Sequence, residues 1–229
     1  MKLFTKTAIL ITMSMFVMFS GCGKKAEVRK ISKRIVFFGD SITFGYGVDT
    51  QKESFYSRID NIMKAGVYDN AVAINAGVNG DNTYSALERI NDVVACKPDI
   101  LIVAFGLNDC QTDSVDPEQF RKNLIKMISF FPRDIRIVLA TSNSFMDTGQ
   151  DTWRNLNGSL DLYMAEIRNL ARERSYPLID VHDIWKNQLR QDSRNLESMY
   201  VDPTHPSAKG HELIYETYMS VLRKLIVEK

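Results

Sequence analysis

The sequence predicts an α/β fold, a doubly wound three-layer sandwich around a five-stranded parallel sheet. Two observations lead to this fold class. Five apolar runs lie along the chain, and stretches with apolar residues at helical spacing separate them. The runs are continuously apolar instead of strictly alternating, which is typical of parallel strands covered by helices on both faces. Strand and helix repeated in this order favour a doubly wound sheet.

The expected strands are short segments that are apolar along their length. They are residues 34–39 (RIVFFG), 71–77 (AVAINAG), 100–106 (ILIVAFG), 135–142 (IRIVLATS) and 177–182 (PLIDVH). In open parallel sheets, ligand sites lie beyond the carboxyl ends of the strands. The residues that directly follow each strand are therefore the first candidates for a functional site.

The clearest helical signatures lie in the second half of the chain. Asp116 is expected to cap a helix that has Pro117 at its first position and an apolar stripe from Phe120 to Phe131. Further stripes at helical spacing cover residues 156–171 and 214–225. We interpret these stripes as core.

The first residues have the pattern of an export signal. Two lysines precede an uncharged, mostly apolar run from Thr7 to Ser20, which is shorter than the roughly 20 residues that span a bilayer. The sequence FSGC that follows resembles the lipobox of bacterial lipoproteins, with Phe19 in the usual place of Leu. The resemblance implies a signal peptide over residues 1–21 and a lipid on Cys22, so an exported protein anchored to the membrane of a bacterial cell envelope. A plain secretory signal and an uncut anchor are the alternatives.

The segment after Cys22 is basic. We expect residues 22–33 to form a tether at a negative membrane surface and residues 34–229 to form one domain. Removal of the signal takes away Lys2 and Lys6, which lowers the formal net charge from +1 to −1. A charge near zero is not the footprint of a nucleic-acid-binding protein.

The two remaining cysteines are expected to stay reduced. Cys96 and Cys110 flank the strand expected at 100–106. An extended segment of that length separates them by roughly 20 Å, whereas a disulfide needs Cα atoms within about 7 Å.

Chemically useful residues follow the expected strands. Gly39, Asp40 and Ser41 follow the first strand, a glycine-rich loop (NAGVNGDNT) lies after the second, and GLND lies after the third. The segment DPTHP, residues 202–206, comes before the last helix. Each taken alone is ordinary turn chemistry.

Together these residues supply the parts of a serine nucleophile. A serine hydroxyl needs a neutral imidazole to take its proton, and that imidazole needs a carboxylate on its other nitrogen. Ser41, His205 and Asp202 are the candidates for these roles. The backbone N–H groups of Ser41 and Gly80 and the side-chain amide of Asn108 are the candidate donors of an oxyanion hole.

GDS, the glycine loop, GLND and DPTHP, in this order, resemble the four motif blocks of the SGNH (GDSL) hydrolase family over essentially residues 34–226. The resemblance implies an SGNH/flavodoxin-like fold and a serine esterase that forms an acyl-enzyme on Ser41. It gives Asp202 the role of orienting carboxylate and His205 that of general base. Gly80 and Asn108 become the oxyanion donors beside the N–H of Ser41.

Two positions stay open. Gly77 competes with Gly80 for the second block, and we prefer Gly80 because it lies deeper in the loop and is followed by Asp81. Asp40 either braces the turn or tunes the electrostatics of the site. We interpret three other reactive residues as structural: Cys110, His182 and His211.

No cofactor is expected. The sequence has three histidines, without metal-ligand spacing, and lacks a phosphate-binding or dinucleotide-binding glycine motif. The expected substrate is a small-molecule, glycan or lipid ester, and the exported context favours esters of polysaccharides or envelope lipids. The alternatives are an acyltransferase with the same triad and a non-catalytic, lipid-anchored binding protein. Residues 143–155 either line the substrate cleft or cap the core.

Overall fold

A computed structural model describes residues 33–68, 71–112, 115–191 and 197–227. The expected signal peptide, Cys22 and all of the expected tether except Lys33 lie outside the described residues. Within the described ranges, no helix has both the length and the apolar character that crossing a membrane requires.

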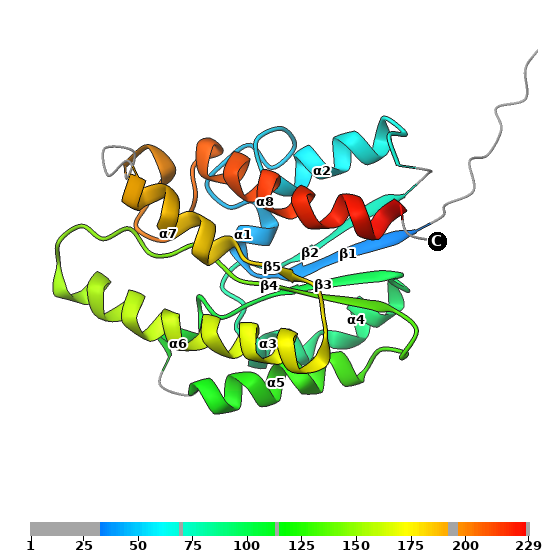
Figure 1. The fold of residues 1–229 in the computed structure, drawn as a ribbon, viewed down its shortest axis with the longest axis horizontal. Helices are drawn as coiled ribbons and strands as arrows, with labels where there is room; N and C mark the ends of the chain where they lie inside the picture. The colour runs from blue at the N-terminus through cyan, green and yellow to red at the C-terminus, as the bar shows by residue number, and fades with distance from the viewer. Residues whose placement is uncertain (1–32, 69–70, 113–114, 192–196, 228–229) are drawn as a thin grey trace, which may run out of the picture.

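Five parallel strands form one sheet in the order β2-β1-β3-β4-β5 (Figure 1). The strands are β1 (Arg34–Gly39), β2 (Val72–Gly77), β3 (Ile100–Ala104), β4 (Arg136–Ala140) and β5 (Leu178–Ile179). The strand order reverses between β1 and β3, which is the switch point where sites form in such sheets. The predicted fold class is confirmed.

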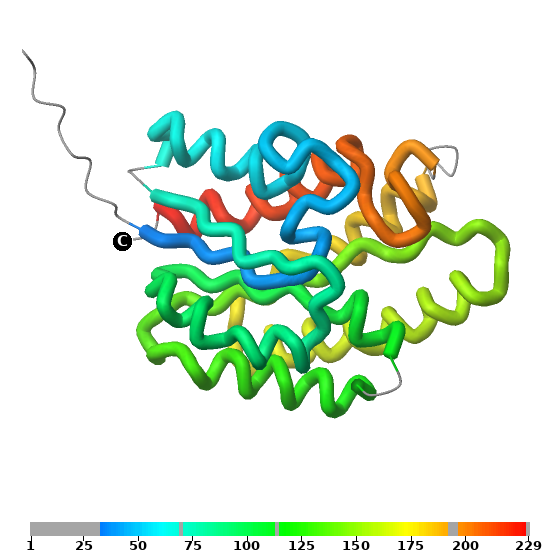
Figure 2. Tube along the Cα trace, turned by 180° about the vertical axis from the view of Figure 1, so that it is seen from behind, coloured from blue at the N-terminus to red at the C-terminus, as the bar shows by residue number. Residues whose placement is uncertain are grey.

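Helices cover both faces of the sheet (Figures 1 and 2). On one face lie α1 (Ser41–Phe44), α2 (Phe55–Lys64), α7 (Val181–Gln191) and α8 (Ala208–Val227). On the other lie α3 (Thr83–Glu88), α4 (Ile90–Ala95), α5 (Pro117–Ser129) and α6 (Asp151–Arg174). The 3-10 turns within the described residues are η1 (Asp109–Gln111) and η3 (Glu197–Met199). The resulting three layers bury β1, β3 and β4, as their continuous apolar runs predicted.

Local sequence explains where α5 begins. The Asp116 side chain accepts a hydrogen bond from the N–H of Gln119 at 2.7 Å, and Pro117 occupies the first turn. Pro117 needs no intrahelical partner there, since it has no N–H. The predicted cap is confirmed.

The fifth strand is shorter than predicted. β5 ends at Ile179 and α7 begins at Val181, whereas the sequence analysis placed a strand over 177–182. The side chain of Asp180 explains the difference, because its Oδ1 accepts a hydrogen bond from the N–H of Asp183 at 3.3 Å and so helps to start the helix. His182 therefore lies in the first turn of α7 and does not end a strand.

Candidate active site

Ser41 is held at the carboxyl edge of the sheet by a sharp turn. Gly39 ends β1 so close to β3 that a Cβ there would lie 2.7 Å from the carbonyl oxygen of Ala104. The side chain of Asp40 accepts a hydrogen bond from the N–H of Ile42 at 3.0 Å and caps α1. Gly45, with a φ of 94°, ends this helix after one turn. Ser41 is thus the first residue of a one-turn helix at the switch point of the sheet.

The structure brings Ser41, His205 and Asp202 into one chain of hydrogen bonds. The Oγ atom of Ser41 lies 2.9 Å from Nε2 of His205. On the other side of the ring, Nδ1 of His205 lies 2.8 Å from Oδ2 and 3.0 Å from Oδ1 of Asp202. A carboxylate on Nδ1 favours the tautomer with the proton on that nitrogen. Nε2 is then free to accept the proton of the Ser41 hydroxyl.

Asp202 also organises its own segment. Its Oδ1 accepts hydrogen bonds from the N–H groups of Thr204 and His205, both at 2.8 Å. Burial raises the pKa of Asp202, but the hydrogen bonds from the His205 ring and from the two N–H groups outweigh it. The pKa of Asp202 therefore lies below its usual value, which keeps the group ionised beside the imidazole.

Tyr46 packs on the imidazole, a contact that the sequence did not reveal. The ring centroids of Tyr46 and His205 are 4.4 Å apart. The N–H of Tyr46 donates to the carbonyl oxygen of Ser41 at 2.9 Å, so the turn that carries Ser41 also places this ring. No sequence pattern indicated the contact, because it joins segments at the two ends of the domain.

The two glycines that competed for the oxyanion hole differ in their surroundings. The N–H of Gly77 donates to Oδ1 of Asn75 at 2.9 Å, and a Cβ on Gly77 would overlap the backbone of Phe44. Gly80 has a φ of 78°, lies at the surface, and its N–H has no hydrogen-bond partner among the described residues. Of these two glycine N–H groups, only that of Gly80 is therefore available to a ligand.

Asn108 joins the loops that follow β2 and β3. Its side-chain Nδ2 donates to the carbonyl oxygen of Asp81 at 2.9 Å. An amide nitrogen carries two hydrogens, so one remains for a ligand. The neighbouring Asp109 is completely buried, and its Oδ1 accepts the N–H of Thr83 at 2.9 Å. These two bonds fix the position of the candidate oxyanion donors relative to each other.

Asp40 is a buried carboxyl group between β1 and α1. Burial raises its pKa to about 7; the hydrogen bond from Ile42 opposes this shift, and the charges of Asp109 and Asp81 add to it. The carboxyl group borders an internal cavity of about 20 Å³, which has room for about one water molecule. The hydrogen bond that Asp40 accepts from the N–H of Ile42 agrees with the brace, the simpler of the two alternatives.

Arg89 is a further supporting residue that the sequence analysis missed. Its Nε lies 2.6 Å from Oδ2 of Asp81, and its Nη2 donates to the carbonyl oxygens of Gly39 at 3.1 Å and Ala76 at 2.9 Å. One guanidinium thus ties the carboxyl ends of β1 and β2 to the loop that carries Gly80. Arg89 lies between α3 and α4, and nothing in the sequence around it indicated this role.

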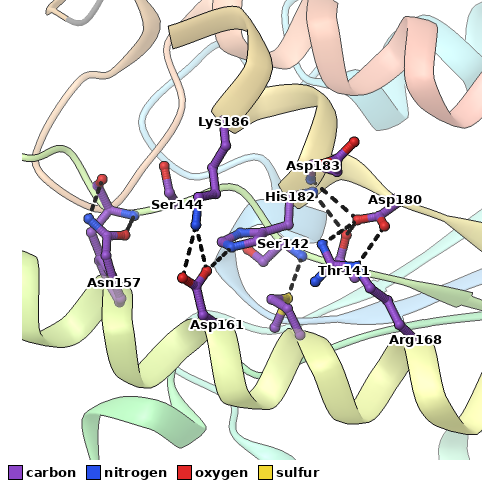
Figure 3. A network of polar contacts seen from close by, with 12 residues as sticks. Thr141, Ser142, Ser144, Asn157, Asp161, Arg168, Asp180, His182, Asp183 and Lys186 are labelled. Carbon is purple, nitrogen blue, oxygen red and sulfur yellow. Dashed lines mark hydrogen bonds and ion pairs between the residues drawn. The ribbon is translucent and has the colours of Figure 1, made fainter. Parts of the chain in front are cut away.

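His182 and His211 both have structural partners. Nε2 of His182 lies 2.6 Å from Asp161, which also receives Lys186, and Figure 3 shows this cluster between α6 and α7. Nδ1 of His211 accepts the N–H of Phe55 at 3.3 Å. Burial lowers the pKa of His211 to about 3, so this ring stays neutral.

The thiols of Cys96 and Cys110 are free, with Cys96 at the end of α4 and Cys110 in η1. The thiol of Cys110 donates to the carbonyl oxygen of Leu107 at 3.2 Å and is buried. Among the residues described, no group of three or more His, Cys, Asp or Glu side chains is placed to hold a metal ion.

The loop after β4 contacts both the core and the segment that precedes α8. Phe145 is buried in the core and packs against Trp153, at 5.9 Å between ring centroids, which agrees with a core cap. The side chain of Asn143 is completely buried, and its Nδ2 donates to the carbonyl oxygen of Thr204 at 3.0 Å. The N–H of Met146 donates to the carbonyl oxygen of Pro203 at 2.8 Å. The loop thereby holds the segment that carries Asp202 and His205.

Comparison with known proteins gives consistent matches. Residues 37–213 match the GDSL-like Lipase/Acylhydrolase family. The "Uncharacterized lipoprotein YqeF" of Bacillus subtilis is 26% identical over 218 residues, which cover 80% of this chain and 86% of that protein. An "Acetylxylan esterase" of Xylanibacter ruminicola is 22% identical over 217 residues, which cover 83% of this chain and 43% of that longer protein.

Solved structures of similar fold include a lipase/acylhydrolase from Enterococcus faecalis. It is 25% identical with a TM-score of 0.68, over 85% of this chain and 95% of its own. A catalytic mutant of Axe2, an acetylxylan esterase from Geobacillus stearothermophilus, is 19% identical with a TM-score of 0.69, over 87% of this chain and 96% of its own. The likeness to Axe2 shows a shared fold.

Proposed function

The chain belongs to the GDSL-like lipase/acylhydrolase family and is a hydrolase of ester bonds, and from this premise we propose that it acts through an acyl-enzyme on Ser41. The observation that carries the proposal is the chain of hydrogen bonds from Oγ of Ser41 through His205 to Asp202, with distances of 2.9 Å and 2.8 Å. These are the distances that proton transfer between a nucleophile and its base requires.

In the first step, Nε2 of His205 takes the proton of Ser41 as Oγ attacks the acyl carbon. The carbonyl oxygen becomes an oxyanion, which accepts hydrogen bonds from the N–H groups of Ser41 and Gly80 and from the Asn108 amide. When the intermediate collapses, the bond to the alcohol breaks and His205 returns the proton to the departing oxygen. The acyl group remains on Ser41.

In the second step, water replaces the alcohol. His205 takes a proton from the water as its oxygen attacks the acyl carbon, and then gives that proton back to Oγ of Ser41. The products are a carboxylic acid, an alcohol and the free enzyme. The ionised Asp202 stabilises the imidazolium that forms in both steps.

We also propose where the enzyme works. Signal cleavage after residue 21, a lipid on Cys22, a tether over 22–33 and a hydrolase domain over 34–229 would place it outside the cytoplasmic membrane. The match to the lipoprotein YqeF supports export, and the match to an acetylxylan esterase supports a carbohydrate ester as substrate. Lipid esters are the other class that this location favours.

Hydrolysis of p-nitrophenyl esters of increasing acyl length tests the mechanism. Ser41→Ala and His205→Ala should each lower kcat/KM by at least about 10³-fold, because the nucleophile and its base act as a unit. Ser129→Ala, an exposed serine on α5, is the matched control and should keep the wild-type rate. If both site variants hydrolyse the esters at wild-type rates, Ser41 is not the nucleophile.

A further inference from the structure

The amino edge of the sheet is rich in positive charge. It consists of the segments that precede the strands and the end of α8, namely residues 33–34, 64–68, 96–99, 129–136, 172–177 and 223–227. Its described acids are Asp99, Asp134 and Glu173. Its described cations are Lys33, Arg34, Lys64, Lys97, Arg133, Arg136, Arg172, Arg174, Arg223 and Lys224.

The carboxyl edge of the sheet is instead rich in acidic residues. It consists of the segments that follow the strands and the loop before α8, namely residues 40–54, 77–83, 105–112, 115–117, 141–151, 180–183 and 197–208. Within these segments, Lys52 is the described cation. Three arginines of the adjoining helices also form ion pairs with acids of this edge: Arg89 with Asp81, Arg154 with Asp147 and Asp151, and Arg168 with Asp180. The described acids are Asp40, Asp49, Glu53, Asp81, Asp109, Asp116, Asp147, Asp151, Asp180, Asp183, Glu197 and Asp202. Such a separation gives the field of the molecule a fixed direction.

Helix dipoles explain part of this pattern. Cations near the last turn of a helix interact favourably with its dipole, which accounts for Arg172, Arg174 and Lys224. Arg133 lies in the loop between α5 and β4, and Arg136 is the first residue of β4. The dipole of a last helical turn does not account for these two.

Exposed apolar side chains lie among the cations. Val67, Phe130 and Val227 are 62%, 43% and 70% exposed. A groove of about 800 Å³ with both polar and apolar lining runs between the ends of α5 and α6, and Arg133 and Arg174 are among its lining residues. Apolar groups beside lysine and arginine are the composition of surfaces that enter the headgroup region of a bilayer.

The chain joins the domain at this same edge. Nζ of Lys33 donates to the carbonyl oxygens of Leu225 and Ile226, both at 2.9 Å, so the start of β1 lies against the end of α8 (Figure 1). The sequence immediately before Lys33 adds further cations, among them Arg29 and Lys30. Ser41 lies beyond the far end of β1, roughly 20 Å away for a strand of that length.

We propose that the amino edge docks on the surface of an anionic phospholipid bilayer. The cations interact with the lipid phosphates, Phe130 and Val227 enter the headgroup region, and the acidic carboxyl edge is repelled. Docking in this orientation turns Ser41 away from the membrane. This interaction depends on the charges of the folded domain and adds to any lipid on Cys22.

The orientation has a consequence for the substrate, which rests on the proposed function. A site that faces away from its membrane reaches esters on glycans or small molecules above that membrane. It does not reach the acyl esters of the lipids on which the protein sits. The acids of this edge that have no arginine partner in the described part of the chain, among them Glu53, Asp116 and Glu197, also disfavour polyanionic esters, so a neutral acylated glycan fits best.

Vesicle sedimentation tests the docking. The core runs from Ile35 to Ile226, so a chain that starts at Gly23 keeps all of it and lacks the lipid. This protein is mixed with vesicles of phosphatidylglycerol and phosphatidylcholine, or of phosphatidylcholine alone. We expect binding to the anionic vesicles that weakens as salt is added, since each cation near the surface contributes about fivefold to the partition coefficient.

Charge reversal locates the docking face. Arg133→Glu combined with Arg174→Glu should lower the partition coefficient by at least about 25-fold. Lys52→Glu combined with Lys122→Glu makes the same change in net charge away from the amino edge, at lysines whose side chains are 81% and 61% exposed. The control should lose far less binding. An equal loss in both pairs, or equal binding to neutral vesicles, would overturn the proposal.

Activity on bound protein tests the orientation. The protein should hydrolyse a soluble p-nitrophenyl ester at the same rate free and on anionic vesicles, and a loss of activity on binding would mean that the site faces the bilayer. Ser41→Ala should bind the vesicles like wild type. Vesicle binding is thereby measured independently of esterase activity. Failure of the docking proposal can then be distinguished from failure of the proposed mechanism on Ser41. Unchanged activity of the Arg133→Glu/Arg174→Glu protein shows that it is folded.

Discussion

The two edges of the sheet are made from the same kinds of segment and are held together in different ways. At the carboxyl edge, buried polar side chains tie one loop to the next: Arg89 to Asp81, Asp109 to Thr83, and Asn143 to Thr204. At the amino edge, Lys33 bonds to the end of α8, and exposed cations lie in the same segments as exposed apolar side chains. A buried network fixes positions and is costly to break, whereas an exposed surface can bind a partner and tolerate substitution.

The largest effect on stability is expected at Arg89. Arg89→Ala leaves the Asp81 carboxylate, whose side chain is 8% exposed, without its ion pair and removes the donor from two strand-end carbonyls. Breaking a buried ion pair on one side costs about 3–5 kcal/mol in the free energy of unfolding. Urea unfolding followed by circular dichroism measures this loss.

Arg133→Ala is the matched substitution at the amino edge. Arg133 is exposed, so its loss should change the free energy of unfolding by less than about 0.5 kcal/mol. Equal losses for the two arginines would show that the edges do not differ as described.

The parts of the site that could be predicted are those with a local signature. Ser41, Asp202 and His205 follow strands or precede a helix in recognisable motifs, and a carboxylate three residues before a histidine can only lie near it. Arg89 and Tyr46 could not be predicted, since their contacts with Asp81 and His205 depend on how distant segments pack. The brace by Asp40 is different, because its partner is the N–H of Ile42 only two residues on, and a local contact of this kind can be suggested by sequence.

The fold was predictable to a similar depth. Continuous apolar runs marked every strand, because burial on both faces of a parallel sheet demands them. The end of β5 was missed because the predicted strand ran past Asp180 to include Val181, whereas the Asp180 side chain favours a helix start. Whether the chain continues the strand or starts a helix at this point depends on a hydrogen bond rather than on hydrophobicity.

Asp40 should make stability fall as pH rises. Its pKa is about 7 in the folded protein against 3.8 when unperturbed, so the folded state holds this proton through the interval where the unfolded state has released it. The stabilising contribution is complete below pH 3.8 and is lost as pH approaches 7. It amounts to at most about 4 kcal/mol in the free energy of unfolding.

Asp40→Asn keeps a side-chain oxygen for the N–H of Ile42 and has no proton to release. Urea unfolding between pH 4 and 8 should therefore show a smaller decline for the variant than for wild type. Asp134→Asn, an exposed acid at the amino edge, should leave the decline unchanged. Identical pH profiles for wild type and Asp40→Asn would mean that this carboxyl group is ionised throughout the range.

A further comparison concerns a pair of glycines, one at each edge. A Cβ on Gly77 would lie 2.9 Å from the carbonyl oxygen of Asp40 and would overlap the backbone of Phe44. Gly77→Ala must therefore push α1 outward, at a cost of about 1–3 kcal/mol in the free energy of unfolding. Because Ser41 moves with α1, kcat/KM for a p-nitrophenyl ester should fall as well.

Gly66 follows α2 with a φ of 73° and ends that helix at the amino edge. Gly66→Ala strains this left-handed residue by about 1–2 kcal/mol, which is comparable to the cost at Gly77. It lies far from Ser41, so kcat/KM should stay at the wild-type value. Two variants of similar stability thus separate the edges by activity alone, and a parallel loss of activity in Gly66→Ala would show that stability, and not the position of α1, limits the reaction.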